Sequence, residues 1–343
     1  MNLDDIKITP LLDNLYLQKI SDEEYFSIKY SNYISNSRLG LINPKQEGSI
    51  DKFFEGFKPI YSSSLDVGSA VHALTLQPEW FTIVDTVDKP TGKMGAIVEE
   101  LFKVCQGKEA NEKVVKEAAT KVDYYKGNVT PTRYDEIVTK YNLYREAKIK
   151  YLETNPEKTP IYLDSKSRET SYNCINAINN NKHIQNILHP KGLIEDPISE
   201  MEQAILLDVR IDMPDTAPFI LKLKAKLDNY VINFEQNEIQ VNDIKTLGKI
   251  LSEFKSNVDK YRYNREIAMY SYLLLLVAEK FYNVKNPIIK GNYLVVSTIP
   301  QYYSKVVAMT KKDFIEGFNE FKYLLRLVAY EVATKYKDFA IWI

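Results

Sequence analysis

The amino-acid sequence predicts an α/β (α+β) fold, with a mixed central β-sheet flanked by helices and a helical insertion. Three consecutive segments have the alternation of polar and apolar residues typical of strands, at 202–213, 219–230 and 239–246. Segments of helical spacing, at 61–80 and 261–279, lie on either side of these strands along the chain. A charged stretch with its own helical segments separates the first helix from the strands. We read residues 90–195 as a helical insertion and 200–310 as the sheet core of a single domain, 1–343.

The second predicted strand has the clearest pattern. Apolar side chains alternate with charged ones, so that one face of the strand belongs to the core and the other presents lysines and one carboxylate. The core face carries Phe219, Leu221, Leu223, Ala225 and Leu227, and the opposite face carries Lys222, Lys224, Lys226 and Asp228.

The next predicted strand carries the triplet Asp243-Ile244-Lys245. Side chains two residues apart on a strand share a face, so Asp243 and Lys245 project together while Ile244 is buried behind them. If the two strands pair, Asp228 faces the same point. Carboxylate oxygens gathered in this way favour Mg²⁺ or Mn²⁺, and a neighbouring ammonium can orient water or stabilise developing negative charge. The alternative is a solvated hairpin with an ordinary ion pair.

Two helices carry further candidate residues. His72 lies on a serine-capped helix that ends near Pro78, one turn after Gly68, and a neutral imidazole there could complete a metal shell. The alternative is an ordinary packed or exposed histidine. On the helix at 261–279, Glu266 and Tyr270 share a face at i, i+4.

Elsewhere the sequence predicts short helices and loops in residues 1–60, one helix at 165–188, and strands at 293–299 and 305–308. A last helix opens with a capping box at Thr310 and Asp313. The two cysteines, Cys105 and Cys174, do not suggest a disulfide framework and exclude a four-cysteine iron–sulfur cluster within this chain. No apolar run reaches the length of a membrane span, so we expect a soluble, cytoplasmic protein without membrane contact.

The net charge of −1 provides no global attraction to nucleic acid. A DNA-binding role therefore depends on local clusters, and the lysines at 222, 224 and 226 are candidates, together with Tyr270. The alternative for each lysine is simple solvation of a sheet face.

Taken together, these motifs resemble those of the PD-(D/E)XK nuclease superfamily, in its RecE-like (exodeoxyribonuclease VIII) and lambda-exonuclease branch. Residues 33–39 look like the entry segment of the family, and Gly68-x-x-x-His72 is similar to its histidine helix. Asp228 and Asp243-x-Lys245 correspond to the signature, and Glu202 to a further acidic position. The chain departs from the family at Glu266, where glutamine is usual, and at Leu227, where proline often precedes the aspartate. These residues and spacings are read from the sequence.

The resemblance implies a restriction-endonuclease-like core and a Mg²⁺-dependent exonuclease that degrades double-stranded DNA ends, 5′ to 3′, in recombination or repair in a bacterium or phage. It implies that His72, Asp228 and Asp243 bind the metal, with Lys245 and Glu266 also in the catalytic set. A homo-oligomer and a single-strand annealing protein as partner are implied as well. Two alternatives stay open: a structure-specific endonuclease of the same superfamily, and a non-catalytic DNA-binding recombination protein on the same fold.

Overall fold

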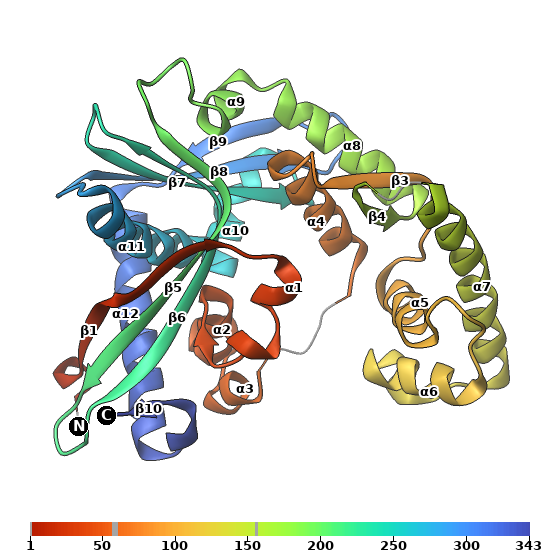
Figure 1. The fold of residues 1–343 in the computed structure, drawn as a ribbon, viewed down its shortest axis with the longest axis horizontal. Coiled ribbons are helices and arrows are strands. Elements are labelled where there is room, and N and C mark those ends of the chain that lie inside the picture. The colour runs from red at the N-terminus through yellow and green to blue at the C-terminus, as the bar shows by residue number, and fades with distance from the viewer. Residues whose placement is uncertain (1, 57–60, 155–156) are drawn as a thin grey trace. The chain divides into compact units, whose positions relative to one another are not determined.

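The computed structural model describes residues 2–56, 61–154 and 157–343 (Figure 1). It divides into two compact units, each described separately below. The first unit comprises Met1–Phe57, Asn181–Val295 and Ser304–Ile343, and the second comprises Lys58–Asn180 and Val296–Tyr303.

The first unit is built on a sheet of eight strands among the described residues, with β1, β5, β6, β7, β8 and β9 in that order and β2 and β10 joining β6. The sheet is mixed, because β2 runs parallel to β6 while β1, β5, β6 and β7 are antiparallel neighbours. The strands are β1 (Lys7–Lys19), β2 (Tyr33–Ile34), β5 (Ile198–Asp212), β6 (Phe219–Asn233), β7 (Glu238–Leu247), β8 (Ile288–Ser297), β9 (Ser304–Ala308) and β10 (Ile341–Trp342).

Strand β6 has different partners along its two edges. One edge pairs with β5 over nearly the whole length of the strand. The other edge pairs in turn with β10 near Phe219, with β2 at Lys222 and Leu223, and with β7 from Asn229 to Asn233. The β6–β7 ladder therefore stops next to Asp228.

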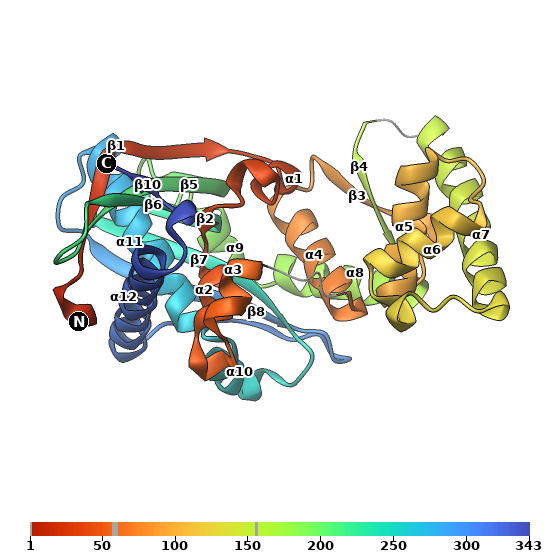
Figure 2. The same cartoon turned by 90° about the horizontal axis from the view of Figure 1, so that it is seen from below.

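Helices α11 (Tyr263–Tyr282) and α12 (Lys311–Thr334) pack side by side against the sheet (Figures 1 and 2). Gly317 of α12 allows this close approach, because a Cβ there would lie 2.3 Å from the carbonyl oxygen of Asn264. The predicted capping box of α12 is confirmed: Asp313 N donates to Thr310 Oγ1 at 3.1 Å, and Thr310 N donates to Asp313 Oδ2 at 3.3 Å. The other helices of this unit are α1 (Asp22–Tyr25), α2 (Asn36–Ile42), α3 (Ile50–Glu55), α9 (Lys182–Leu188) and α10 (Phe254–Tyr261).

The hydrophobic core follows the predicted alternation of β6. All five apolar side chains of its predicted core face are buried, and they belong to one cluster with residues of α11 and α12. The predicted α/β fold, with a mixed central sheet flanked by helices, is thus confirmed.

The second unit has a core of its own, made by α5, α6, α7 and β3. Helix α4 packs on α8, and β3 pairs in parallel with β4. The elements are α4 (Ser63–Leu76), β3 (Phe81–Asp88), α5 (Gly92–Cys105), α6 (Glu112–Lys121), α7 (Pro131–Thr154), β4 (Thr159–Leu163) and α8 (Ser165–Asn179). Ser62 caps α4 as predicted, accepting a hydrogen bond from Leu65 N at 3.3 Å.

Three expectations differ from the structure. Residues 1–60 contain a long strand, β1, in place of only helices and loops. Strand β4 lies within the stretch expected to be a helical insertion, and β3 lies at residues for which no element was predicted. The single helix at 165–188 is two helices, because Asn181 caps α9 with its own side chain and ends the run. The unit apart from the sheet spans Lys58–Asn180 and therefore also contains α4, while the bounds of the helical insertion, 90–195, stay a prediction.

Within the described residues, no helix combines the length and the apolar character that crossing a membrane would require.

Candidate functional site

The candidate site lies where β6 and β7 separate. The last paired residues are Asn229 and Asn242, and beyond them the Asp228 side chain takes the place of a ladder partner. Its Oδ2 accepts a hydrogen bond from the main-chain N–H of Ile244 at 2.7 Å. Asp228 and Asp243 thus emerge from adjacent strands at the point of divergence.

Three asparagines stabilise the branch point, the place next to Asn229 and Asn242 where β6 and β7 separate. The Asn242 amide nitrogen donates to Asn229 Oδ1 at 2.7 Å, and that of Asn292 donates to Asn242 Oδ1 at 2.9 Å. All three side chains are buried, and they cross β6, β7 and β8. Each amide side chain hydrogen-bonds to the next one, which satisfies polar groups that burial removes from water. Sequence reasoning missed this row, although Asn229 and Asn242 directly adjoin the two aspartates.

Lys245 is held between two carboxylates. Its Nζ lies 2.7 Å from Asp243 Oδ2 and 2.9 Å from Glu266 Oε2. Burial opposes the charge of Lys245, but the carboxylates of Asp243 and Glu266 raise its pKa well above the ordinary value. An ammonium at this position stays charged and can stabilise negative charge.

Asp243 is buried, with only 3% of its surface exposed. Burial raises the pKa of Asp243 to about 8; the Lys245 ammonium opposes this shift, and the charges of Glu266 and Asp228 add to it. A divalent cation would relieve this accumulation of carboxylates.

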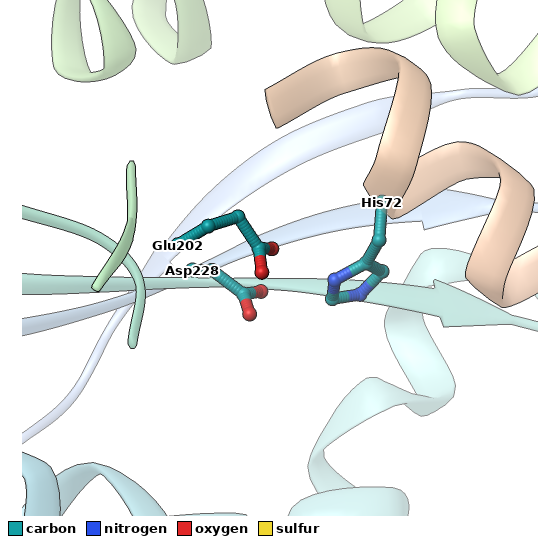
Figure 3. Close-up of side chains that lie close together, drawn as sticks. All are labelled: His72, Glu202 and Asp228. Carbon is teal, nitrogen blue, oxygen red and sulfur yellow. The ribbon is translucent and has the colours of Figure 1, made fainter. Parts of the chain in front are cut away.

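Glu202 lies across from Asp228 on the neighbouring strand. The register pairs Met201 with Asn229 and Gln203 with Leu227, which places Glu202 opposite Asp228. One carboxylate oxygen of each lies within 4.8 Å of one of the other. Figure 3 shows the two carboxylates close together. Burial, together with the charge of Asp228, raises the pKa of Glu202. Glu202 is therefore a stronger metal-ligand candidate than the sequence suggested.

The backbone at Glu202 is unusual, with φ of 56° in the left-handed region. A non-glycine residue held in a sparsely populated region costs of order 1–3 kcal/mol, and such residues cluster at functional sites. Lys226 fixes the side chain through an ion pair of 2.6 Å. Glu202 thus has a left-handed backbone within a continuous strand, and its carboxylate lies close to that of Asp228.

Helix α11 places Glu266 and is anchored by Arg265, whose side chain is 1% exposed. The Arg265 guanidinium donates to Asn36 Oδ1 at 2.8 Å and to Gln46 Oε1 at 2.9 Å, and it lies 3.3 Å from Glu320 Oε1. Tyr270 Oη donates to Glu266 Oε1 at 3.4 Å from one turn further along α11. Glu266 is thus fixed from two directions.

His72 lies on α4 in the second unit, with its side chain half-buried. Figure 3 labels it along with the two carboxylates. The carboxylates belong to the first unit, so a place for His72 among the metal ligands stays a prediction.

The predicted DNA-contact residues have different environments. Lys224 is buried against Tyr25, where its Nζ donates to the carbonyl oxygen at 2.7 Å, and burial lowers its pKa to about 8. Tyr270 is engaged with Glu266. Lys226 is paired with Asp22 and Glu202. Lys222 lies over the Tyr33 ring, 5.4 Å from its centroid. Lys224 and Tyr270 thus have partners within the protein, and contact of these residues with DNA stays a prediction.

No family model and no curated protein matches the chain. Among solved structures, the "putative exonuclease" from Eubacterium rectale is 12% identical with a TM-score of 0.44, covering 92% of this chain and 88% of that one. Rai1 of Scheffersomyces stipitis, in complex with (3′-NADP)+ and calcium ion, is 9% identical with a TM-score of 0.24, covering 97% of this chain and 86% of that one. Likenesses this distant carry no argument about function. A proposal about function therefore depends on the residues of the site.

Proposed function

We propose that the protein is a metal-dependent deoxyribonuclease that degrades double-stranded DNA from its ends. The observation that carries the proposal is the convergence of Asp228, Asp243 and Lys245 where β6 and β7 separate, with Glu202 opposite Asp228. Clustered carboxylates beside a charged lysine suit phosphodiester hydrolysis better than a structural role, because burying them is costly unless a cation compensates.

The donor set fits a hard divalent cation. Carboxylate oxygens of Glu202, Asp228 and Asp243 would hold Mg²⁺ or Mn²⁺, and His72 completes the set in our proposal, as the family resemblance implies. When bound, such a cation polarises the phosphodiester and lowers the pKa of water.

The protein's own residues supply the rest. Lys245 orients the attacking water and stabilises the negative charge that develops on the phosphate oxygens. Glu266 and Asp243 hold the Lys245 ammonium in place. Asp228 is fixed through the Ile244 N–H, so the ligand geometry is set before substrate binds.

Polarity and biological role rest on the family resemblance. We propose 5′-to-3′ degradation in recombination or repair, in the cytoplasm of a bacterial or phage-infected cell, as a homo-oligomer beside a single-strand annealing protein. The alternatives are an endonuclease of the same superfamily and a non-catalytic DNA-binding protein on this fold.

The test uses a linear duplex labelled separately at its 5′ and 3′ ends and a closed circular duplex, each with Mg²⁺ and with EDTA. Ordered loss of the 5′ label, only with Mg²⁺ and only from the linear duplex, supports the proposal. Nicking of the circle supports the endonuclease. DNA binding without cleavage of either substrate, with Mg²⁺ or Mn²⁺, supports the non-catalytic alternative.

A further inference from the structure

A column of three aromatic rings passes the candidate site and ends at the protein surface. Tyr263 stacks on Phe254 on one side, with centroids 6.1 Å apart and planes at 24°, and on Tyr261 on the other, at 5.6 Å and 26°. Phe254 is buried, whereas Tyr261 is 44% exposed. The column therefore presents one aromatic ring to solvent.

The middle ring of the column contacts the site itself. Lys245 Nζ lies 4.7 Å from the centroid of the Tyr263 ring, a cation–π distance. Tyr261 is thus one stacked ring away from the lysine that we place at the scissile phosphate. A nucleotide neighbouring that phosphate could place its base at the end of the column.

The main chain around Tyr261 is fixed by contacts with neighbouring residues. Arg262 stands between α10 and α11 with φ of 55°, and this left-handed residue turns the chain so that the flanking tyrosines stack. Its guanidinium makes a double contact with Glu320, at 3.0 Å and 2.5 Å. Gln46 Nε2 also donates to the carbonyl oxygen of Tyr261 at 3.3 Å. The surface ring is therefore pre-organised.

A cation accompanies the exposed ring. Lys260 is exposed, and its Nζ lies 5.1 Å from the Tyr261 centroid. An aromatic ring with an exposed ammonium over it suits the binding of unpaired nucleotides, in which the base stacks on the ring and the ammonium moves to neutralise the phosphate. A buried packing role would not leave the outer ring and the lysine in solvent.

We propose that Tyr261 is the stacking platform for an unpaired nucleobase at the DNA end, with Lys260 contacting the adjacent phosphate. The inference rests on the proposed nuclease function and adds to it a preference for ends that carry or fray into single-stranded nucleotides.

The test uses linear duplexes with 2-aminopurine in a short unpaired tract at the 5′ or the 3′ end, bound in Ca²⁺ and cleaved in Mg²⁺. Stacking on Tyr261 quenches the fluorescence of 2-aminopurine in the wild type. Tyr261→Ala should remove the quenching and weaken binding by about 5- to 150-fold, the usual contribution of one stacked base. Tyr261→Trp should keep the quenching and the binding affinity. The matched control is Tyr323→Ala, at a half-exposed tyrosine on α12.

The two hypotheses fail in different ways. If the wild type neither binds nor cleaves the duplexes, the proposed function fails and the platform with it. If the wild type cleaves but Tyr261→Ala binds and quenches as the wild type does, the platform alone is wrong. The platform is also wrong if Tyr261→Ala changes only the oligomeric state.

Discussion

At the scale of single residues, Glu266 lies where the nuclease family that the sequence resembles usually has glutamine. The structure places Glu266 next to Lys245, so we assign it a positioning role. Its carboxylate holds Lys245 at 2.9 Å and accepts from Tyr270. Lys245 contacts Oε2 of Glu266 and Tyr270 contacts Oε1, so the amide oxygen of a glutamine can accept from Lys245 while its NH2 group donates to Tyr270 Oη. Glu266→Gln should therefore keep most of the cleavage rate, whereas Glu266→Ala should lose more. Initial rates on a linear duplex measure this. A glutamine variant as inactive as the alanine variant would remove the positioning role.

The raised pKa of Asp243 gives a pH dependence with a definite sign. An unfolded aspartate has a pKa of about 3.9, and burial raises the pKa of Asp243 to about 8. Between those values the native state keeps a proton that the unfolded state has lost, so the metal-free protein loses stability as pH rises. Mg²⁺ needs the deprotonated carboxylate, so it should raise Tm more at about pH 8.5 than at about pH 6.

Asp243→Asn is the control for this prediction, because an amide at 243 cannot titrate. The pH dependence of the Mg²⁺-induced Tm shift should become flatter in this variant. Equal Mg²⁺ shifts at both pH values in the wild type would contradict the assignment of Asp243 to the metal site.

At the scale of elements, the branch point of β6 and β7 depends on the three buried asparagines. Asn242→Ala leaves Asn229 Oδ1 and the Asn292 amide without their partner. Each unsatisfied buried group costs about 1–3 kcal/mol, so the free energy of unfolding should fall by an amount of this order. Urea unfolding measures it, with Gln236→Ala in the exposed β6–β7 turn as control. An unchanged urea midpoint would show that the asparagine row does not stabilise the branch.

The elements that the sequence predicted well are those with a complete local signal. The alternation of β6 and the capping box of α12 are each encoded within a few residues. Strand β1 was missed because it is an edge strand with a register shift between Pro10 and Leu15, which interrupts the alternation. The position of Glu202 was indicated, but its left-handed backbone depends on pairing with β6 and has no local signal.

At the scale of the whole molecule, each of the two units has its own stabilising contacts. In the second unit, Lys148 pairs with Glu99 at 2.9 Å and lies over three rings, with its Nζ 4.3 Å from the centroid of Phe102, 5.2 Å from that of Tyr144 and 4.8 Å from that of Tyr162. Lys148→Ala should therefore destabilise this unit by about 1–3 kcal/mol, because a charged hydrogen bond and its packing are lost.

The two tryptophans allow the units to be followed separately, since Trp80 belongs to the second unit and Trp342 to the first. In single-tryptophan variants, Lys148→Ala should lower the urea midpoint reported by Trp80 more than that reported by Trp342. Equal shifts for both probes would show that the two units unfold as one cooperative structure.

The central claim is that Lys245 serves chemistry at a metal-dependent site. The most direct measurement compares cleavage of a linear duplex in Mg²⁺ by the wild type, Lys245→Ala and Lys249→Ala, with DNA binding measured in parallel. Lys249 is an exposed lysine of the same segment, paired with Glu253, and serves as the matched control. Lys245→Ala should bind DNA and lose cleavage by on the order of a hundredfold or more, while Lys249→Ala cleaves normally. Comparable cleavage by the wild type and Lys245→Ala would contradict the account.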